Sequence, residues 1–167
     1  MGIAVKVLKV NGTANHVRAR QFDQSLQQQL NQDQPDLVIG FDKMSGLDLY
    51  FAAAPCFVTR TAKRTALYRL LPRYRTFRNL EGAVFGPSTA TQILLLDDRE
   101  RDHYQRTWQT SSDRFVLLPP GIDKNRLKGP DADALRQQGR TEFGVGEQDK
   151  LVLLLAANFE LKGLDRA

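Results

Sequence analysis

Residues 92–118 read QILLLDDRERDHYQRTWQTSSDRFVLL, and this stretch decides the fold class. Residues 92–96 and 114–118 are short apolar runs of the kind that form buried parallel strands. The polar residues 99–108 between them predict a helix, and Asp97 and Asp98 can cap its first turn. A strand, a helix and a second strand in this order indicate a βαβ unit, and therefore a parallel sheet in an α/β fold.

The same alternation of apolar runs and helical patterns continues on both sides of this stretch. It predicts a strand over residues 3–10, a helix over 17–32, apolar strands over 37–40 and 47–54, two helices separated at Pro72, a linker with one helix over 123–140, and a strand over 151–157.

Polar residues that follow the predicted strands are the candidates for chemistry, because ligands bind outside the carboxyl ends of parallel strands. These residues are Asp42 and Lys43, Asp97 and Asp98, Gly121 with residues 123–126, and Asn158 with Lys162.

The composition is that of a globular protein, since 41% of the 167 residues are hydrophobic. Cys56 is the single cysteine, and no Cys/His spacing is typical of a zinc site, so we expect a reducing compartment and no metal. The first residues lack the features of a secretory signal, and no apolar run approaches the roughly 20 residues that span a bilayer. We therefore expect a cytoplasmic protein that is soluble or peripheral on a membrane.

The positive charge is concentrated between Arg60 and Arg78, a stretch with seven basic and no acidic residues. Because the whole chain has a net charge of +5, the remainder is slightly acidic. Three interpretations fit this basic segment: a face that lies on an anionic membrane, a site for RNA or single-stranded nucleic acid, or a solvated face whose apolar stripe packs on the sheet.

Two further segments follow predicted strands. Lys162 stands where a predicted strand meets a helix start, and the free N–H groups of such a start favour a phosphate. Gly121 belongs to a rigid Pro-Pro-Gly turn with Arg126 just behind it, and glycine permits a conformation or a close backbone approach closed to other residues. A surface lysine and an ordinary turn explain the same residues.

Four stretches carry a resemblance to a known family: VIGFDKMSGLDLYFAA (38–53), LYRLLPRYRTF (67–77), RFVLLPPGI (114–122) and FELKGLDR (159–166). In order and spacing they resemble the lipopolysaccharide core glucosyltransferases of Gram-negative bacteria. These are retaining nucleotide-sugar glycosyltransferases of the GT-B fold, in which two Rossmann-like domains face a cleft. They place glucose on inner-core heptose.

The resemblance implies an acceptor-binding Rossmann-like domain over residues 1–118, an interdomain linker with a helix over 119–149, and the start of the nucleotide-sugar domain over 150–167. It implies UDP-glucose as donor, bound without a metal or cofactor by Lys162, Arg126 and Gly121. Asp42 and Lys43 are the acceptor-side candidates, the acceptor being the inner core of lipopolysaccharide. The catalytic residues stay unidentified.

The resemblance also favours the membrane interpretation over nucleic acid. It implies a protein peripheral on the cytoplasmic face of the inner membrane, with an anionic membrane surface as partner. The residues expected to face it are Arg60, Lys63, Arg64, Arg69, Arg73, Tyr74, Arg75 and Arg78.

The chain also departs from the family pattern. Ala54 stands where the family tends to carry an aspartate, and Leu161 stands where a second basic residue is common. The family's glycine-bearing loop and its acidic E-x7-E motif fall outside the 167 residues. We therefore expect a fragment that transfers no sugar on its own. The alternative is a non-catalytic module that binds anionic membrane or nucleic acid through residues 60–78.

Overall fold

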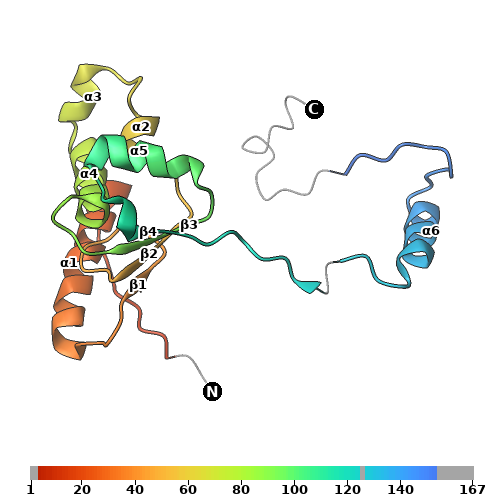
Figure 1. Cartoon of the computed structure of the whole chain (residues 1–167), viewed down its shortest axis with the longest axis horizontal. Coiled ribbons are helices and arrows are strands. Elements are labelled where there is room, and N and C mark those ends of the chain that lie inside the picture. Colours follow the sequence, from red (N-terminus) through yellow and green to blue (C-terminus); the bar gives the residue numbers. More distant parts are fainter. Residues whose placement is uncertain (1–3, 125–126, 154–167) are drawn as a thin grey trace. The chain divides into compact units, whose positions relative to one another are not determined.

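The computed structural model describes residues 4–124 and 127–153. The chain divides into two compact units, residues 1–120 and 121–167, and each is described by itself. The helices and strands of the first unit are α1 (Asn15–Asp33), β1 (Ile39–Gly40), β2 (Leu49–Ala52), α2 (Phe57–Arg60), α3 (Ala66–Leu70), α4 (Pro72–Phe85), β3 (Gln92–Leu95), α5 (Arg99–Trp108), the 3-10 turn η1 (Ser112–Arg114) and β4 (Phe115–Leu117); the second contains α6 (Ala132–Glu142) (Figure 1).

Four strands of the first unit form a parallel sheet in the order β1-β2-β3-β4. In this register Tyr50 lies beside Ile93, and Ile93 lies beside Phe115. Each neighbouring pair is parallel, which requires a crossover between consecutive strands. The predicted α/β fold with a parallel sheet is therefore confirmed.

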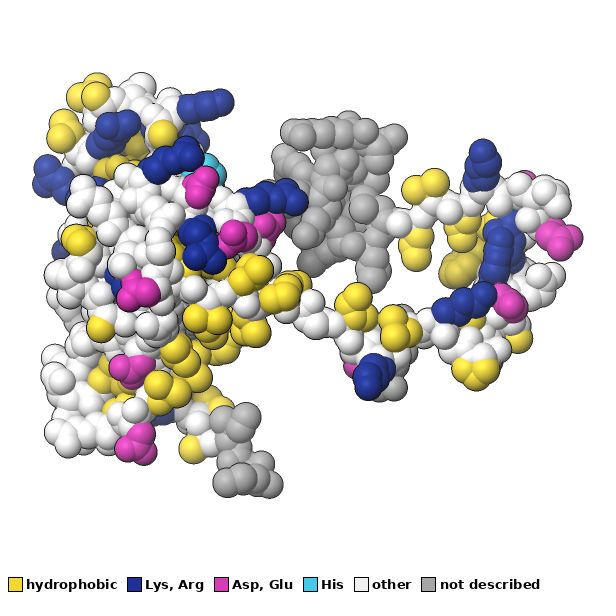
Figure 2. Space-filling view, in the orientation of Figure 1, with side chains coloured by type: hydrophobic (Ala, Val, Ile, Leu, Met, Phe, Trp, Pro, Cys, Tyr) yellow, Lys and Arg dark blue, Asp and Glu magenta, His cyan; other side chains and the backbone are white. Residues whose placement is uncertain are grey.

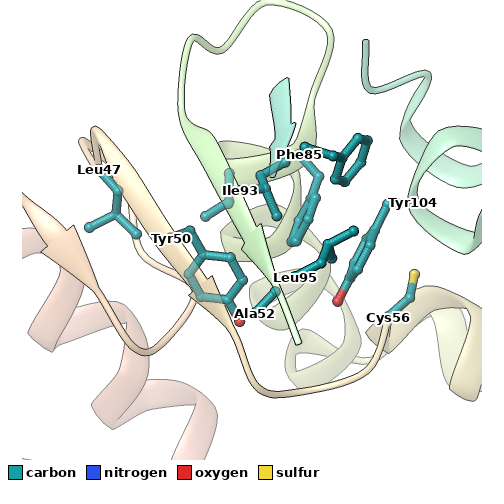
Figure 3. Packing of buried hydrophobic residues seen from close by; sticks show 10 residues of the cluster. Leu47, Tyr50, Ala52, Cys56, Phe85, Ile93, Leu95 and Tyr104 are labelled. Atoms are coloured by element: carbon teal, nitrogen blue, oxygen red, sulfur yellow. The ribbon is translucent and has the colours of Figure 1, made fainter. Parts of the chain in front are cut away.

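The core lies against one face of this sheet. Alternate residues of β2 and β3 are fully buried there, including Tyr50, Ile93 and Leu95 (Figure 3). They pack against Phe85 of α4 and Tyr104 of α5, whose rings stack at a centroid distance of 3.7 Å. The other face is only half covered by the described residues, and Figure 2 shows hydrophobic side chains gathered over the strands.

Local sequence signals explain where the helices begin and end. Pro72 occupies the first turn of α4, as predicted, because its missing N–H is not needed there. The backbone N–H of Arg99 donates to the Asp97 carboxylate at 3.0 Å, so Asp97 caps α5. Asp98 precedes the helix without a capping hydrogen bond and instead pairs with Arg101.

Two predictions about the strands and one about the basic segment differ from the structure. Residues 4–10 of the predicted first strand are not in a strand, because alternation alone supplies no neighbouring strand to pair with. Leu151–Leu153 of the last predicted strand are exposed and irregular, and the rest of it lies outside the described residues. The basic segment contains three helices rather than two, because α2 and α3 are separate short turns.

A buried carboxylate joins the elements of the first unit. Glu81 of α4 is fully buried, and it accepts a hydrogen bond at 2.5 Å from the Lys43 ammonium, which follows β1. Its oxygens also accept the backbone N–H of Phe57 at 2.7 Å and of Val58 at 3.1 Å, at the start of α2. The indole N–H of Trp108 donates to it at 3.1 Å from the end of α5. Glu81 therefore connects four segments through one side chain.

We expect Glu81→Gln to lower the free energy of unfolding by about 3–5 kcal/mol, because the buried Lys43 ammonium would lose its counter-charge. Urea unfolding of the 167-residue chain, followed by circular dichroism, measures this. Glu147→Gln removes an exposed carboxylate and should change stability by about 0.5 kcal/mol at most. Equal effects of the two substitutions would contradict a central role for the buried pair.

Candidate functional site

A cavity of about 300 Å³ opens at the carboxyl ends of β1 and β2. Asp42 and Lys43 come to it directly after β1, and Ala54 comes to it after β2. This is the edge of a parallel sheet at which ligands usually bind. The other lining residues are Ala19, Met44, Tyr50, Pro55, Phe57, Arg60, Phe77 and Leu80.

The Tyr50 hydroxyl is the most informative atom of this cavity. Tyr50 is fully buried, and among the described residues its hydroxyl oxygen has no hydrogen-bond partner. Burial, together with the nearby carboxylates of Asp42 and Glu81, raises the pKa of Tyr50 well above its ordinary value. The phenol therefore keeps its proton and presents an O–H donor that lacks an acceptor. A buried donor left unpaired costs about 1–3 kcal/mol, which a ligand oxygen could recover.

The neighbouring Tyr104 provides the contrast. In Figure 3 the hydroxyl ends of Tyr50 and Tyr104 both lie toward the lower part of the view. The Tyr104 hydroxyl donates to the carbonyl oxygen of Ala54 at 2.9 Å, so it is satisfied within the protein. Of these two buried phenols, Tyr50 is the one whose hydroxyl lacks a partner among the described residues.

The two acceptor-side candidates lie at the cavity together but differ in what they can do. Lys43 is engaged, since it donates to Glu81 and also to the carbonyl oxygen of Pro55 at 2.9 Å, and its side chain is 14% exposed. It therefore holds the cavity wall in place. Asp42 is exposed and makes no hydrogen bond or ion pair within the described residues. Its carboxylate is free to accept from a ligand.

The cavity combines groups that suit a ligand with several hydroxyls. Asp42 supplies an acceptor, the Tyr50 hydroxyl and the Arg60 guanidinium supply donors, and the rings of Phe57 and Phe77 supply apolar surface. Sequence reasoning placed Asp42 and Lys43 here from the strand ends. It missed Tyr50 because a tyrosine inside an apolar strand predicts only core packing, and it assigned Arg60 to a different face.

The three donor-side candidates belong to residues 121–167, the second unit. Arg126 and Lys162 lie outside the described residues. Gly121 is exposed in the second unit, its φ is not positive, and an added Cβ would meet no atom within 4 Å. The conformational need for glycine expected at this turn is therefore absent. No cluster of His, Cys, Asp or Glu within residues 4–124 and 127–153 could hold a metal ion.

The seven cations of the basic segment are exposed, but Tyr74 is not. Its ring is buried against Phe57 and Tyr68, so the expectation that Tyr74 faces a membrane is wrong. The apolar stripe of α4 to which Tyr74 belongs packs inside the protein, as the solvated-face interpretation requires.

The exposed apolar surface of the basic segment belongs to α3. Leu67 is 75% exposed and Leu70 is 61% exposed, and Leu71 directly follows the helix. Figure 2 shows apolar and basic side chains mixed in this region, at the upper left of the view. No helix of the described residues is long and apolar enough to cross a bilayer.

Comparison with known proteins identifies a homologue. No protein-family model matches the chain. The chain is 36% identical to the lipopolysaccharide glucosyltransferase WaaG of Escherichia coli (strain K12) over 159 residues. This alignment covers 95% of this chain and 42% of that protein. The crystal structure of WaaG, a glycosyltransferase involved in lipopolysaccharide biosynthesis, matches with a TM-score of 0.85 and 36% identity over 95% of this chain and 43% of that one. The chain thus spans less than half the length of this relative, and its fold matches part of a GT-B structure.

The two tyrosines provide a matched test of the unpaired donor. We expect Tyr50→Phe to leave the free energy of unfolding unchanged or to raise it by about 1 kcal/mol, because no hydrogen bond is lost. Tyr104→Phe should lower it by about 1 kcal/mol, because the bond to Ala54 is lost. Urea unfolding of both variants measures the difference. Equal destabilisation by the two substitutions would show that the Tyr50 hydroxyl is already satisfied.

Proposed function

We propose, from its homology to WaaG, that this chain supplies the acceptor-binding part of a retaining glycosyltransferase. The reaction would transfer glucose from UDP-glucose to an inner-core heptose of lipopolysaccharide. The observation that supports this most directly is the unpaired Tyr50 hydroxyl in a cavity at the carboxyl ends of the strands. In this proposal residues 1–118 form the acceptor side, residues 119–149 the linker, and residues 150–167 the start of the nucleotide-sugar side.

The cavity suggests how a sugar would be held. The Tyr50 O–H would donate to a sugar oxygen, and the Asp42 carboxylate would accept from a sugar hydroxyl. The Lys43–Glu81 pair would keep the two strand-end loops in place around the ring. Directional groups on a rigid edge orient the attacking hydroxyl, which lowers the entropic part of the barrier.

The donor side of the proposal depends on residues outside this cavity. Lys162 and Arg126 would neutralise the diphosphate of UDP-glucose, with Gly121 as the third donor-side residue, because negative charge develops on departing UDP. No metal is required in this proposal. Since the chain spans 42% of the length of WaaG, we propose that these 167 residues alone bind acceptor but transfer no glucose.

The exposed surface around α3 supports a second part of the proposal, which is peripheral attachment to the cytoplasmic face of the inner membrane. Leu67 and Leu70 would enter the headgroup region, and the neighbouring arginines would attract anionic lipids. Because the apolar face of α4 is buried, α3 is the element that can insert. The same charges favour one alternative function, a non-catalytic module for anionic membranes or nucleic acid.

We expect the chain to bind the delipidated inner-core oligosaccharide that ends in heptose, and Asp42→Asn and Tyr50→Phe each to weaken binding about 5- to 30-fold. Tyr50→Phe removes one hydrogen bond to the sugar, and Asp42→Asn removes the negative charge that strengthens another. Isothermal titration calorimetry measures the affinity, and Asp36→Asn, an exposed carboxylate outside the cavity, is the matched control.

Two results would overturn this proposal. One is an affinity for the oligosaccharide that neither cavity variant lowers relative to Asp36→Asn. The other is glucose transfer by the 167-residue chain itself when UDP-glucose is added, which would show that the donor side is already complete in these residues.

We expect the chain to float with vesicles that contain anionic phospholipid and not with neutral vesicles, and Leu67→Ser with Leu70→Ser to reduce the bound fraction several-fold. Leu135→Ser, at an exposed leucine of the second unit, should have no effect. An RNA shift assay over a salt series runs in parallel. Binding to RNA without binding to anionic vesicles would favour the nucleic-acid module instead.

A further inference from the structure

A second cavity of about 410 Å³ lies between α1 and α4. Its walls come from both helices and from the loop after β1, and α1 and α4 pack directly against each other. The lining residues are mostly polar: Arg20, Asp23, Gln24, Ser45, Pro72, Arg75, Thr76, Asn79 and Leu80.

Two arginines of this second cavity are free to bind a ligand. The guanidinium groups of Arg20 and Arg75 are exposed and make no hydrogen bond or ion pair with any described residue. The carboxylate in the cavity, Asp23, is already engaged, because its oxygens accept the backbone N–H of Ser45 at 2.7 Å and the Ser45 hydroxyl at 3.1 Å. Two guanidinium groups and one bonded carboxylate thus line the second cavity, which gives its lining a net positive charge. Planar guanidinium groups match the paired oxygens of carboxylates and phosphates.

The two cavities share a wall. Leu80 of α4 lines both, and the consecutive residues Met44 and Ser45 line one cavity each. A ligand with a sugar ring in the first cavity could therefore extend past Leu80 and reach the arginines of the second. The first cavity suits neutral hydroxyls and the second suits an anion.

We propose that the second cavity binds an anionic substituent, a phosphate ester or a sugar carboxylate, of the glycan whose neutral ring occupies the first. The identity of this glycan rests on the proposed function, whereas anion binding between Arg20 and Arg75 does not. The proposal moves Arg75 from the membrane-facing set to the glycan site.

The test is a titration of the 167-residue chain, with its arginine side chains and backbone amides observed by NMR, using inorganic phosphate or acetate at constant ionic strength in chloride. We expect saturable shifts at residues of the second cavity. Arg20→Gln with Arg75→Gln should weaken this binding about tenfold or more, because each substitution removes a charged hydrogen-bond donor. Arg18→Gln with Arg136→Gln removes the same charge from two exposed residues outside the cavity and should change it less than about twofold.

The outcomes separate the possible explanations. Saturation by phosphate but not by acetate identifies a phosphate ester, and the reverse identifies a sugar acid. Equal losses in both double variants, or shifts that never saturate, would overturn the proposal in favour of diffuse positive charge. If anions bind but the heptose oligosaccharide does not, the proposed function fails while this site stands. If the oligosaccharide binds with unchanged affinity to Arg20→Gln with Arg75→Gln, the inference fails while the function stands.

Discussion

The buried carboxylate of Glu81 is the constraint on which the first unit depends. Removing a carboxylate from water costs several kcal/mol unless charges and donors compensate for it. Here the compensation comes from an ammonium after β1, two backbone N–H groups at the start of α2 and an indole N–H at the end of α5. Because these donors belong to different segments, satisfying Glu81 also fixes the loops that surround the first cavity. The geometry of the first cavity therefore depends on the buried interactions of Glu81.

The buried Glu81 carboxylate also determines the role of Lys43, which is bound to it. The sequence does not predict this contact. Apolar runs and helical spacing predict β2, β3, β4, α1 and α5, because burial and periodicity are recorded in consecutive residues. Glu81 carries no such signal, since an acidic residue in a helix normally lies in solvent. The position of Lys43 at a strand end was predictable, but its ion pair with Glu81 was not. That ion pair joins residues that are 38 positions apart in the sequence.

In the basic segment too, the sequence predicts the charge but not the packing of the helices. Its seven cations are visible in the sequence and are exposed in the structure. Which apolar residues are exposed beside these cations depends on how the helices pack. The apolar stripe of α4 has the spacing of a membrane-surface helix, yet Tyr74 and Val84 are buried in the protein. The leucines of α3 have no clean periodicity, yet they remain exposed because none of the described elements covers them. Periodicity identifies the face that will be buried and does not identify what buries it.

The distribution of unpaired polar groups therefore says more about ligands than the distribution of charge. Lys43 and Asp23 carry full charges, but each is bonded within the fold and serves to hold a loop. Tyr50 is neutral, but its hydroxyl is buried, and neither it nor the guanidinium groups of Arg20 and Arg75 have a partner in the described part of the chain. The buried Tyr50 hydroxyl gives up stability that a ligand oxygen can restore, whereas the two exposed arginines stay hydrated until an anion binds. A ligand that uses both kinds of group combines hydroxyl oxygens with an anionic group, and a glycan with an acidic substituent does so within one molecule.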